Sequence, residues 1–316
     1  MCKQTKRVMI CGLWIVGLTL STPLFVAGAD KAEDMPTLDA KYPGLATGAL
    51  TYARLASLPE GVLLKAGELT LREKEVADRI AQAPQPQQEQ VRKNAFYVLE
   101  GMATTKLLVQ AAKAQTSNAD PNERDLIQRY LQGLVEKVAV SDQEVADFYQ
   151  ANKDSCGGAT LDQVKGQIKQ IVLDQKQQDL VDQHIRTLGQ RIPIEVSAEW
   201  TKAQAVLAKD NPVDKARSSG RPSLVDFGST GCRPCDMLAP ILETLKTKYA
   251  GKVNVVFVHT GQEQILASRY GIKTIPMQFF YDKDGKEVFR HIGFWPQDEI
   301  EKKLAEMGVQ QPKEAQ

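Results

Sequence analysis

Two of the five cysteines, Cys232 and Cys235, stand three positions apart in the stretch G-S-T-G-C-R-P-C-D-M-L at residues 228–238. This spacing occurs in redox-active dithiols, in zinc sites and in short structural disulfides. A zinc site needs two more cysteine or histidine ligands at suitable spacing, and the three histidines are scattered at positions 184, 259 and 291. We therefore favour dithiol–disulfide exchange over a structural disulfide, with no metal and no cofactor other than the disulfide of this pair.

The pair falls where a predicted strand at 223–227 gives way to a predicted helix at 232–250. At a helix start, unpaired N–H groups and the helix dipole favour the thiolate of Cys232. Cys235, one turn further on, can then attack a mixed disulfide formed on Cys232. Pro234 suits the first helical turn because its missing N–H would have no partner there. Strands at 253–258, 277–281 and 287–292 and helices at 262–270 and 297–307 follow.

Two stretches resemble the thioredoxin family: L-V-D-F-G-S-T-G-C-R-P-C-D-M-L-A-P-I-L at 224–242 and G-I-K-T-I-P-M-Q-F-F-Y-D-K-D-G-K-E-V at 271–288. The resemblance implies an α/β thioredoxin-like three-layer domain over residues 211–316. It also implies that Cys232 attacks, that Cys235 resolves, and that Asp226 is a buried acid that moves the Cys235 proton. Pro276 is expected in the cis form opposite the cysteines, and Ile275 is expected to present its backbone to a bound peptide.

The chain departs from the family pattern beside the cysteines. Gly228 and Gly231 stand where two tryptophans are usual, and Arg233 replaces a small residue. Gly293 matches a family glycine near the site. Arg233 and Pro234 are therefore the residues expected to tune the redox site, because a cation beside a thiolate stabilises the reduced form and makes the potential less negative.

The first residues predict export. Lys3, Lys6 and Arg7 precede an apolar run at 8–20, and Ala27-Gly28-Ala29 follows. This order is typical of a secretory signal peptide cleaved after Ala29, and the apolar run is shorter than the ~20 residues of a membrane span. We expect a periplasmic or otherwise exported protein.

Net charge argues against two classes of partner. The formal charge of +1 becomes −2 once the three basic residues of the signal are removed. This balance gives no electrostatic case for nucleic acid or for a polybasic membrane patch. No further apolar run reaches spanning length, so no stable membrane span is expected after cleavage.

The region before the cysteines shows mainly helical periodicity. We expect an extended leader at 30–61, a strand at 62–65, a strand at 192–196, and helices at 71–81, 88–113, 122–136, 142–152 and 161–190. Three helix starts carry a capping box, in which the first and fourth side chains bind each other's backbone N–H groups. They are Thr70 with Glu73, Ser141 with Glu144, and Thr160 with Gln163.

Residues 62–199 resemble the N-terminal helical module of SurA-type periplasmic chaperones. The resemblance is carried by G-E-L-T-L-R-E-K-E-V at 67–76, S-D-Q-E-V-A-D-F-Y at 141–149 and G-G-A-T-L-D-Q-V-K-G-Q-I at 157–168. It implies an all-α module that binds unfolded polypeptide. No room remains for the prolyl isomerase domain found in some relatives, so no isomerase activity is expected. A helical scaffold or dimerisation arm is the alternative.

Together these patterns predict a multidomain protein with a signal peptide at 1–29, a leader at 30–61, a helical module at 62–199, a linker at 200–210 that forms one more short helix, and the thioredoxin-like domain at 211–316. The expected partners are unfolded or disulfide-bonded exported proteins and a redox partner of unknown identity. The alternative function is a chaperone or assembly protein whose redox domain is secondary. Cys156 is either a free thiol or a partner in intermolecular pairing or regulation.

Overall fold

The computed structural model describes residues 35–115, 122–156 and 158–310. The predicted signal peptide, with Cys2 and Cys11, lies outside these residues. Within the described part of the chain, no helix is both long enough and apolar enough to cross a bilayer.

The C-terminal half is built on a four-stranded sheet in the order β6-β5-β7-β8. The strands are β5 (Ser223–Gly228), β6 (Asn254–His259), β7 (Met277–Tyr281) and β8 (Glu287–Ile292). Strand β5 runs parallel to β6 and antiparallel to β7, and β7 and β8 form a hairpin. The strands predicted from the sequence are confirmed to within one residue at each end.

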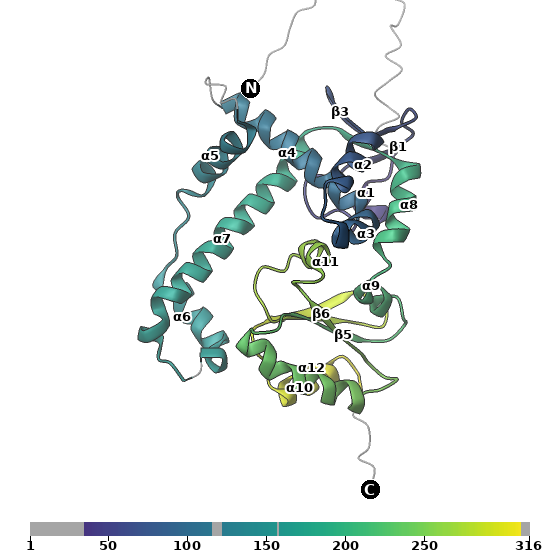
Figure 1. Ribbon diagram of the computed structural model, residues 1–316. Coiled ribbons are helices and arrows are strands. Elements are labelled where there is room, and N and C mark those ends of the chain that lie inside the picture. Colours follow the sequence, from purple (N-terminus) through teal and green to yellow (C-terminus); the bar gives the residue numbers. More distant parts are fainter. Residues whose placement is uncertain (1–34, 116–121, 157, 311–316) are drawn as a thin grey trace, which may run out of the picture. The chain divides into compact units, whose positions relative to one another are not determined.

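Helices cover both faces of this sheet, with α10 and α12 on one face and α9 and α11 on the other (Figure 1). Successive strand residues point to opposite faces of the sheet, so side chains of β5 pack against the helices on both faces. Leu224 packs with the α10 and α12 side chains, whereas Val225 packs with those of α9 and α11. Trp295 stacks on His291, with ring centroids 4.7 Å apart. The helices are α9 (Pro212–Arg217), α10 (Arg233–Lys248), α11 (Gln264–Arg269) and α12 (Gln297–Glu306).

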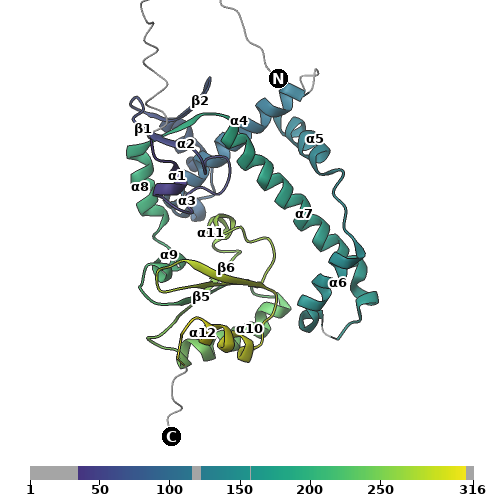
Figure 2. The same cartoon turned by 180° about the vertical axis from the view of Figure 1, so that it is seen from behind.

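The N-terminal half is predominantly helical, as predicted. Its helices are α1 (Leu38–Lys41), α2 (Glu73–Ala81), α3 (Gln85–Lys93), α4 (Ala95–Gln115), α5 (Glu123–Val135), α6 (Asp142–Ala151), α7 (Leu161–Arg191) and α8 (Ala198–Ala208), with a 3-10 turn at Lys153–Cys156. Figure 2 shows α5 beside α4 and α6 beside α7. The capping boxes at Ser141 and Thr160 are confirmed.

The expectation of an all-α module is wrong, because this half also contains a four-stranded sheet in the order β1-β4-β2-β3. The strands are β1 (Arg54–Ala56), β2 (Val62–Ala66), β3 (Leu69–Arg72) and β4 (Ile194–Ser197). Leu64 on β2 and Val196 on β4 are paired and fully buried. The sheet buries an apolar surface that the helices alone would leave open to water.

The capping box at Thr70 is also wrong. Thr70 pairs with Lys65 in the β2–β3 hairpin. Thr70 is therefore a strand residue and does not cap a helix. Helix α2 begins at Glu73 instead, and the Glu75 carboxylate accepts a hydrogen bond from the Arg72 N–H at 2.8 Å.

The expected extended leader is, from Met35 onward, an integral part of the N-terminal core. Leu38 and Leu50 are fully buried in it. The Glu100 carboxylate on α4 accepts hydrogen bonds from the N–H groups of Thr47, Gly48 and Leu50 at 3.0, 2.9 and 3.1 Å. These bonds satisfy backbone donors that an apolar core would otherwise leave unpaired.

Three further features fix the helices of this core. The helix predicted at 88–113 is broken at Asn94, whose side-chain Nδ2 donates to the Gln90 carbonyl at 2.9 Å. Helix α7 crosses the leader at Gly189, where a Cβ atom would clash with the backbone of Ala49. Trp200 on α8 packs beside Phe96, with ring centroids 6.1 Å apart.

Arg269 joins elements from both halves, which together form one compact unit from Met35 onward. Its Nη1 donates to the Ala208 carbonyl at the end of α8, at 2.8 Å, and to Asn94 Oδ1 at 3.4 Å. Its Nη2 donates to the Gly44 carbonyl at 3.5 Å and lies 3.7 Å from Asp214 Oδ2 on α9. The segment expected as a linker is thus helix α8, with Ala205 and Ala208 buried in the core.

Candidate active site

The two cysteines lie at the N-terminus of α10 and form a disulfide, with Cα atoms 5.2 Å apart. Cys232 is the N-cap residue, and its carbonyl accepts the Asp236 N–H at 2.9 Å. Cys232 is half-buried, whereas Cys235 is only 5% exposed. Of the two sulfur-bearing residues, Cys232 is therefore the one that a macromolecular disulfide can reach.

A loop that enters β7 lies against this disulfide. The Ile275–Pro276 peptide bond is cis, and the Ile275 carbonyl oxygen lies 3.9 Å from Cys232 Sγ. The Pro276 carbonyl accepts the Gly293 N–H at 2.8 Å. Gly293 has φ of 100°, a backbone conformation that favours glycine and lets its N–H reach this carbonyl. The loop backbone is thus anchored beside the sulfur atoms.

Asp226 lies on the α10 face of β5 because strand alternation places it on the same side as Leu224. Its side chain is 1% exposed, and burial raises its pKa to about 7, although a hydrogen bond from Gln278 lowers it. The donor is Gln278 Nε2, at 2.7 Å from Asp226 Oδ1. Gln278 is fully buried directly opposite Asp226 in the β5–β7 ladder.

Gly228 leaves space between Asp226 and Cys235. A Cβ atom built on Gly228 would lie 3.3 Å from Asp226 Oδ2, 3.5 Å from the Cys235 Cβ and 3.0 Å from Phe257 Cε2. The carboxyl group and the cysteine therefore flank the same point. At this position a side chain of any size would enter the space between them.

A family profile described as a thioredoxin-like domain matches residues 210–308. A thioredoxin from Alicyclobacillus acidocaldarius is 34% identical over 98 residues, which are 31% of this chain and 92% of that protein. The chain belongs to the thioredoxin family.

Other thioredoxins match the same thioredoxin-like domain. Thioredoxin 1 from a Nostoc species is 37% identical over 104 residues, or 33% of this chain and 87% of that protein. The crystal structure of thioredoxin NaTrxh from Nicotiana alata covers 30% of this chain and 80% of that chain, at 28% identity and a TM-score of 0.28. The N-terminal half lies outside the family match, which starts at residue 210.

The structure brings together Cys232, Cys235, Asp226, Ile275 and Pro276. Pro234 lies in the first turn of α10, and Arg233 is exposed and makes no ion pair with another described residue. Cys156 lies apart in the N-terminal half as a free cysteine, and its Sγ lies 3.4 Å from the Asn152 carbonyl oxygen. Residues 35–115, 122–156 and 158–310 contain no cluster of three side chains able to hold a metal.

Sequence reasoning missed two features of the site. Gln278 was not singled out, although an amide in the apolar run M-Q-F-F-Y needs a buried partner. The loop before Pro276 is also held by helix α7: Gln175 Nε2 donates to Thr274 Oγ1 at 3.1 Å, and Lys273 Nζ lies 2.9 and 2.7 Å from Asp179 and Asp182. No short-range pattern signals these contacts.

Proposed function

We propose that this protein is an exported thiol–disulfide oxidoreductase that acts on protein disulfides through Cys232 and Cys235. The observation that carries the proposal is the disulfide at the start of α10, with the Ile275 carbonyl 3.9 Å from the sulfur of the half-buried Cys232. Membership of the thioredoxin family supports the same chemistry. The N-terminal half is proposed to bind unfolded polypeptide clients.

The first step begins from the reduced form, with a thiolate on Cys232. This thiolate attacks one sulfur of a client disulfide, a Cys232–client bond forms, and the other client sulfur leaves as a thiolate. The helix dipole favours the attacking thiolate. The backbone of Ile275 positions the client chain beside it.

The second step releases the client. Asp226 in its ionised form accepts the Cys235 proton, and the resulting thiolate attacks the Cys232 sulfur. The Cys232–Cys235 disulfide forms, the bond to the client breaks, and the second client sulfur leaves as a thiolate. Two electrons pass from the protein to the client. The reverse sequence oxidises a client dithiol, and the redox partner sets the direction.

The test of this proposal is reduction of insulin disulfides by the mature protein, with dithiothreitol as electron source. Cys232→Ser is expected to abolish turnover because no attacking thiolate remains. Cys235→Ser is expected to accumulate a mixed disulfide between Cys232 and the client, visible on a non-reducing gel. Equal turnover by the wild type and Cys232→Ser would refute the assignment.

A second candidate function is that of a chaperone or assembly protein in which the redox domain is secondary. It is favoured by the extent of residues 35–209, which have their own helical and sheet core outside the family match. The full-length Cys232→Ser/Cys235→Ser variant separates the two functions. Suppression of aggregation of a reduced, denatured client by this variant supports client binding without redox chemistry. Absence of suppression at several-fold molar excess favours a scaffold.

Export is proposed from the first 29 residues of the sequence. Fractionation of expressing cells, with N-terminal sequencing of the product, tests this point. A mature chain beginning at Asp30 in the exported fraction is the expected result, and an intact N-terminus in the cytoplasmic fraction would contradict it.

A further inference from the structure

We propose that the half-open cavity lined by α4, α7 and the loop before Pro276 binds an extended segment of the client chain while the client cysteine is bonded to Cys232. This inference rests on the proposed oxidoreductase function and locates a second binding site for the same client. The cavity has a volume of about 900 Å³, which lies within the range of ligand pockets and holds several residues of extended chain.

The cavity and the redox site share one loop. Residues Gly271–Thr274 form one wall of the cavity, and the next residue, Ile275, places its carbonyl 3.9 Å from Cys232 Sγ. A client cysteine bonded to that sulfur must bring its own backbone against the same loop. Because an extended chain advances about 3.3 Å per residue, a few further residues carry it past Thr274 into the cavity.

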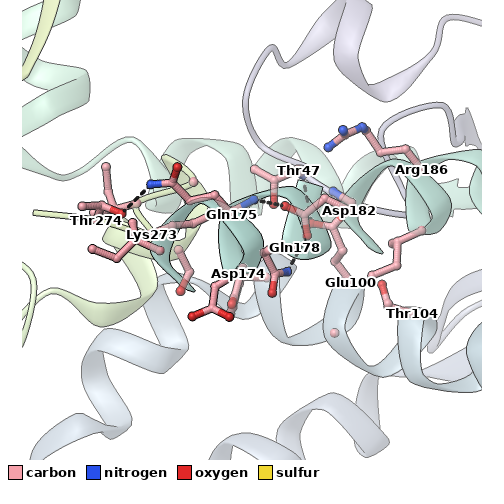
Figure 3. Close-up of a pocket in the computed structure, with 18 residues that line it drawn as sticks. Thr47, Glu100, Thr104, Asp174, Gln175, Gln178, Asp182, Arg186, Lys273 and Thr274 are labelled. Carbon is pink, nitrogen blue, oxygen red and sulfur yellow. Dashed lines mark hydrogen bonds and ion pairs between the residues drawn. The ribbon is translucent and has the colours of Figure 1, made fainter. Parts of the chain in front are cut away.

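Helix α7 holds this wall in place. Lys273 is ion-paired with Asp179 and Asp182. Thr274 accepts a hydrogen bond from Gln175 (Figure 3). These contacts use the loop's polar side chains. Because these contacts involve side chains only, the backbone of the loop makes no hydrogen bond to α7 through them. A client chain could therefore bind to that backbone.

The rest of the lining suits a polypeptide in extended form. The side chains of Arg186 on α7 and Thr104 on α4 line the cavity and make no hydrogen bond or ion pair with another described residue (Figure 3). Both groups can donate to backbone carbonyls of a bound chain. Ile171, Ile185 and Ile272 supply apolar surface, and Ile171 is 39% exposed.

The charged groups do not favour a compact anion or cation as the ligand. Glu100 accepts hydrogen bonds from three backbone N–H groups, and Asp182 is paired with Lys273. Asp174 accepts a hydrogen bond from Gln170 at 2.7 Å. The cavity therefore presents scattered donors between apolar side chains, which is the pattern expected for a peptide backbone with mixed side chains.

The chain offers a matched pair of variants for the test. Gln178 and Gln170 are exposed residues of α7, and each donates to the aspartate four residues later, at 2.8 and 2.7 Å. Gln178 lines the cavity, whereas Gln170 does not. Gln178→Trp should obstruct part of the cavity, and Gln170→Trp adds the same bulk outside it.

The experiment compares full-length wild type with both variants, each first reduced and then freed of reductant, on two disulfides, scrambled ribonuclease, whose rearrangement needs no net electrons, and the small linear bis(2-hydroxyethyl) disulfide, which takes two electrons from the Cys232–Cys235 dithiol. Gln178→Trp should raise KM for scrambled ribonuclease several-fold with kcat little changed, while Gln170→Trp leaves both constants unchanged. Neither variant should alter the rate at which bis(2-hydroxyethyl) disulfide oxidises the reduced protein, because this disulfide is too small to reach the cavity. An unchanged KM for ribonuclease in Gln178→Trp would overturn the inference.

The two disulfides also separate this inference from the proposed function. If the wild type reacts with neither, and Cys232→Ser behaves in the same way, then the oxidoreductase assignment itself has failed. If the wild type reacts with both and the two tryptophan variants match it, then only the cavity assignment has failed.

A second measurement does not depend on turnover. In the Cys235→Ser background, ribonuclease is trapped on Cys232, and benzoylphenylalanine is placed at position 178 or at position 170. Light-dependent cross-linking to the trapped client from position 178 and not from position 170 is the expected result. Equal cross-linking from the two positions, or none from 178, would contradict occupation of the cavity.

Discussion

The buried carboxyl of Asp226 makes the stability of the protein depend on pH. Burial raises its pKa to about 7, whereas an aspartate in the unfolded chain titrates near pH 4. Between these values the native state holds the extra proton, so the free energy of unfolding falls as pH rises from about 4 to about 7 and is constant above that. Between about pH 4 and pH 7 the free energy of unfolding falls by an amount on the order of 4 kcal/mol.

Asp226→Asn removes this dependence because the amide stays neutral and its oxygen still accepts from Gln278. Urea unfolding of the oxidised variant should show higher stability than wild type at pH 8 and similar stability at pH 4. Glu243→Gln, which alters an exposed acid on α10, serves as the control, and its stability should equal that of the wild type at both pH 4 and pH 8. A wild-type stability that does not change between pH 4 and 8 would contradict the burial argument.

Gln278 is predicted to set the pH at which Asp226 works as a base. Its hydrogen bond favours the ionised carboxylate, so Gln278→Leu should raise the pKa of Asp226 above about 7. Release of client from the mixed disulfide, followed by stopped flow, should then reach half its maximal rate at a higher pH than in wild type. Met277→Leu, on the opposite face of β7, should leave the midpoint unchanged, and an unshifted midpoint in Gln278→Leu would argue against this role.

At the residue scale the cysteines and Pro276 were predictable because their signals lie within short stretches of sequence. Gln278 was not, because its partner Asp226 lies 52 residues away and meets it only through the β5–β7 register. The residues of a short motif are neighbours in the sequence, so the motif can be recognised from the sequence alone. A cross-strand hydrogen bond is fixed by strand order, which no short stretch contains.

The crossing of α7 over the leader gives a prediction at the element scale. Gly189→Ala places a methyl group against the Ala49 backbone, and such overpacking costs about 1–3 kcal/mol. Gly166→Ala in the same helix meets open space and should stabilise the protein by up to ~1 kcal/mol through helix propensity. Urea unfolding of both variants measures the difference, and equal effects would show that the contact with Ala49 is relaxed.

Most helices of the N-terminal half followed from their periodicity and caps, and the strands expected at 62–65 and 192–196 correspond to β2 and β4, but β1 and β3 were not expected. Strand β1 has three residues and pairs in parallel with β4, which lies about 140 positions later in the chain. The hairpin formed by β2 and β3 overrode the capping signal at Thr70 because strand pairing satisfied the same backbone groups. Short strands give too few residues for a period to be recognised.

For the whole molecule, Arg269 is the contact whose removal should matter most. It is 9% exposed and bonds to Ala208, Asn94 and Gly44 while facing Asp214. Arg269→Gln leaves these groups without their cationic partner, a loss of about 3–5 kcal/mol for a buried pair. We expect scanning calorimetry to show one transition for wild type and two for the variant.

The ion pairs of Lys273 provide the comparison. Lys273 is 29% exposed, so Lys273→Gln should cost no more than ~1 kcal/mol and keep a single transition. If Arg269→Gln also unfolded in one transition with the wild-type midpoint, the two halves would be coupled by other contacts.

The placement of the aromatic side chains has a practical consequence for spectroscopy. Within the described residues tryptophan occurs twice, as Trp200 against Phe96 in the N-terminal core and as Trp295 against His291 in the thioredoxin-like domain. Each indole therefore emits from a different half of the protein. Trp200→Phe and Trp295→Phe variants would make intrinsic fluorescence a reporter of one half at a time, with no added dye or label.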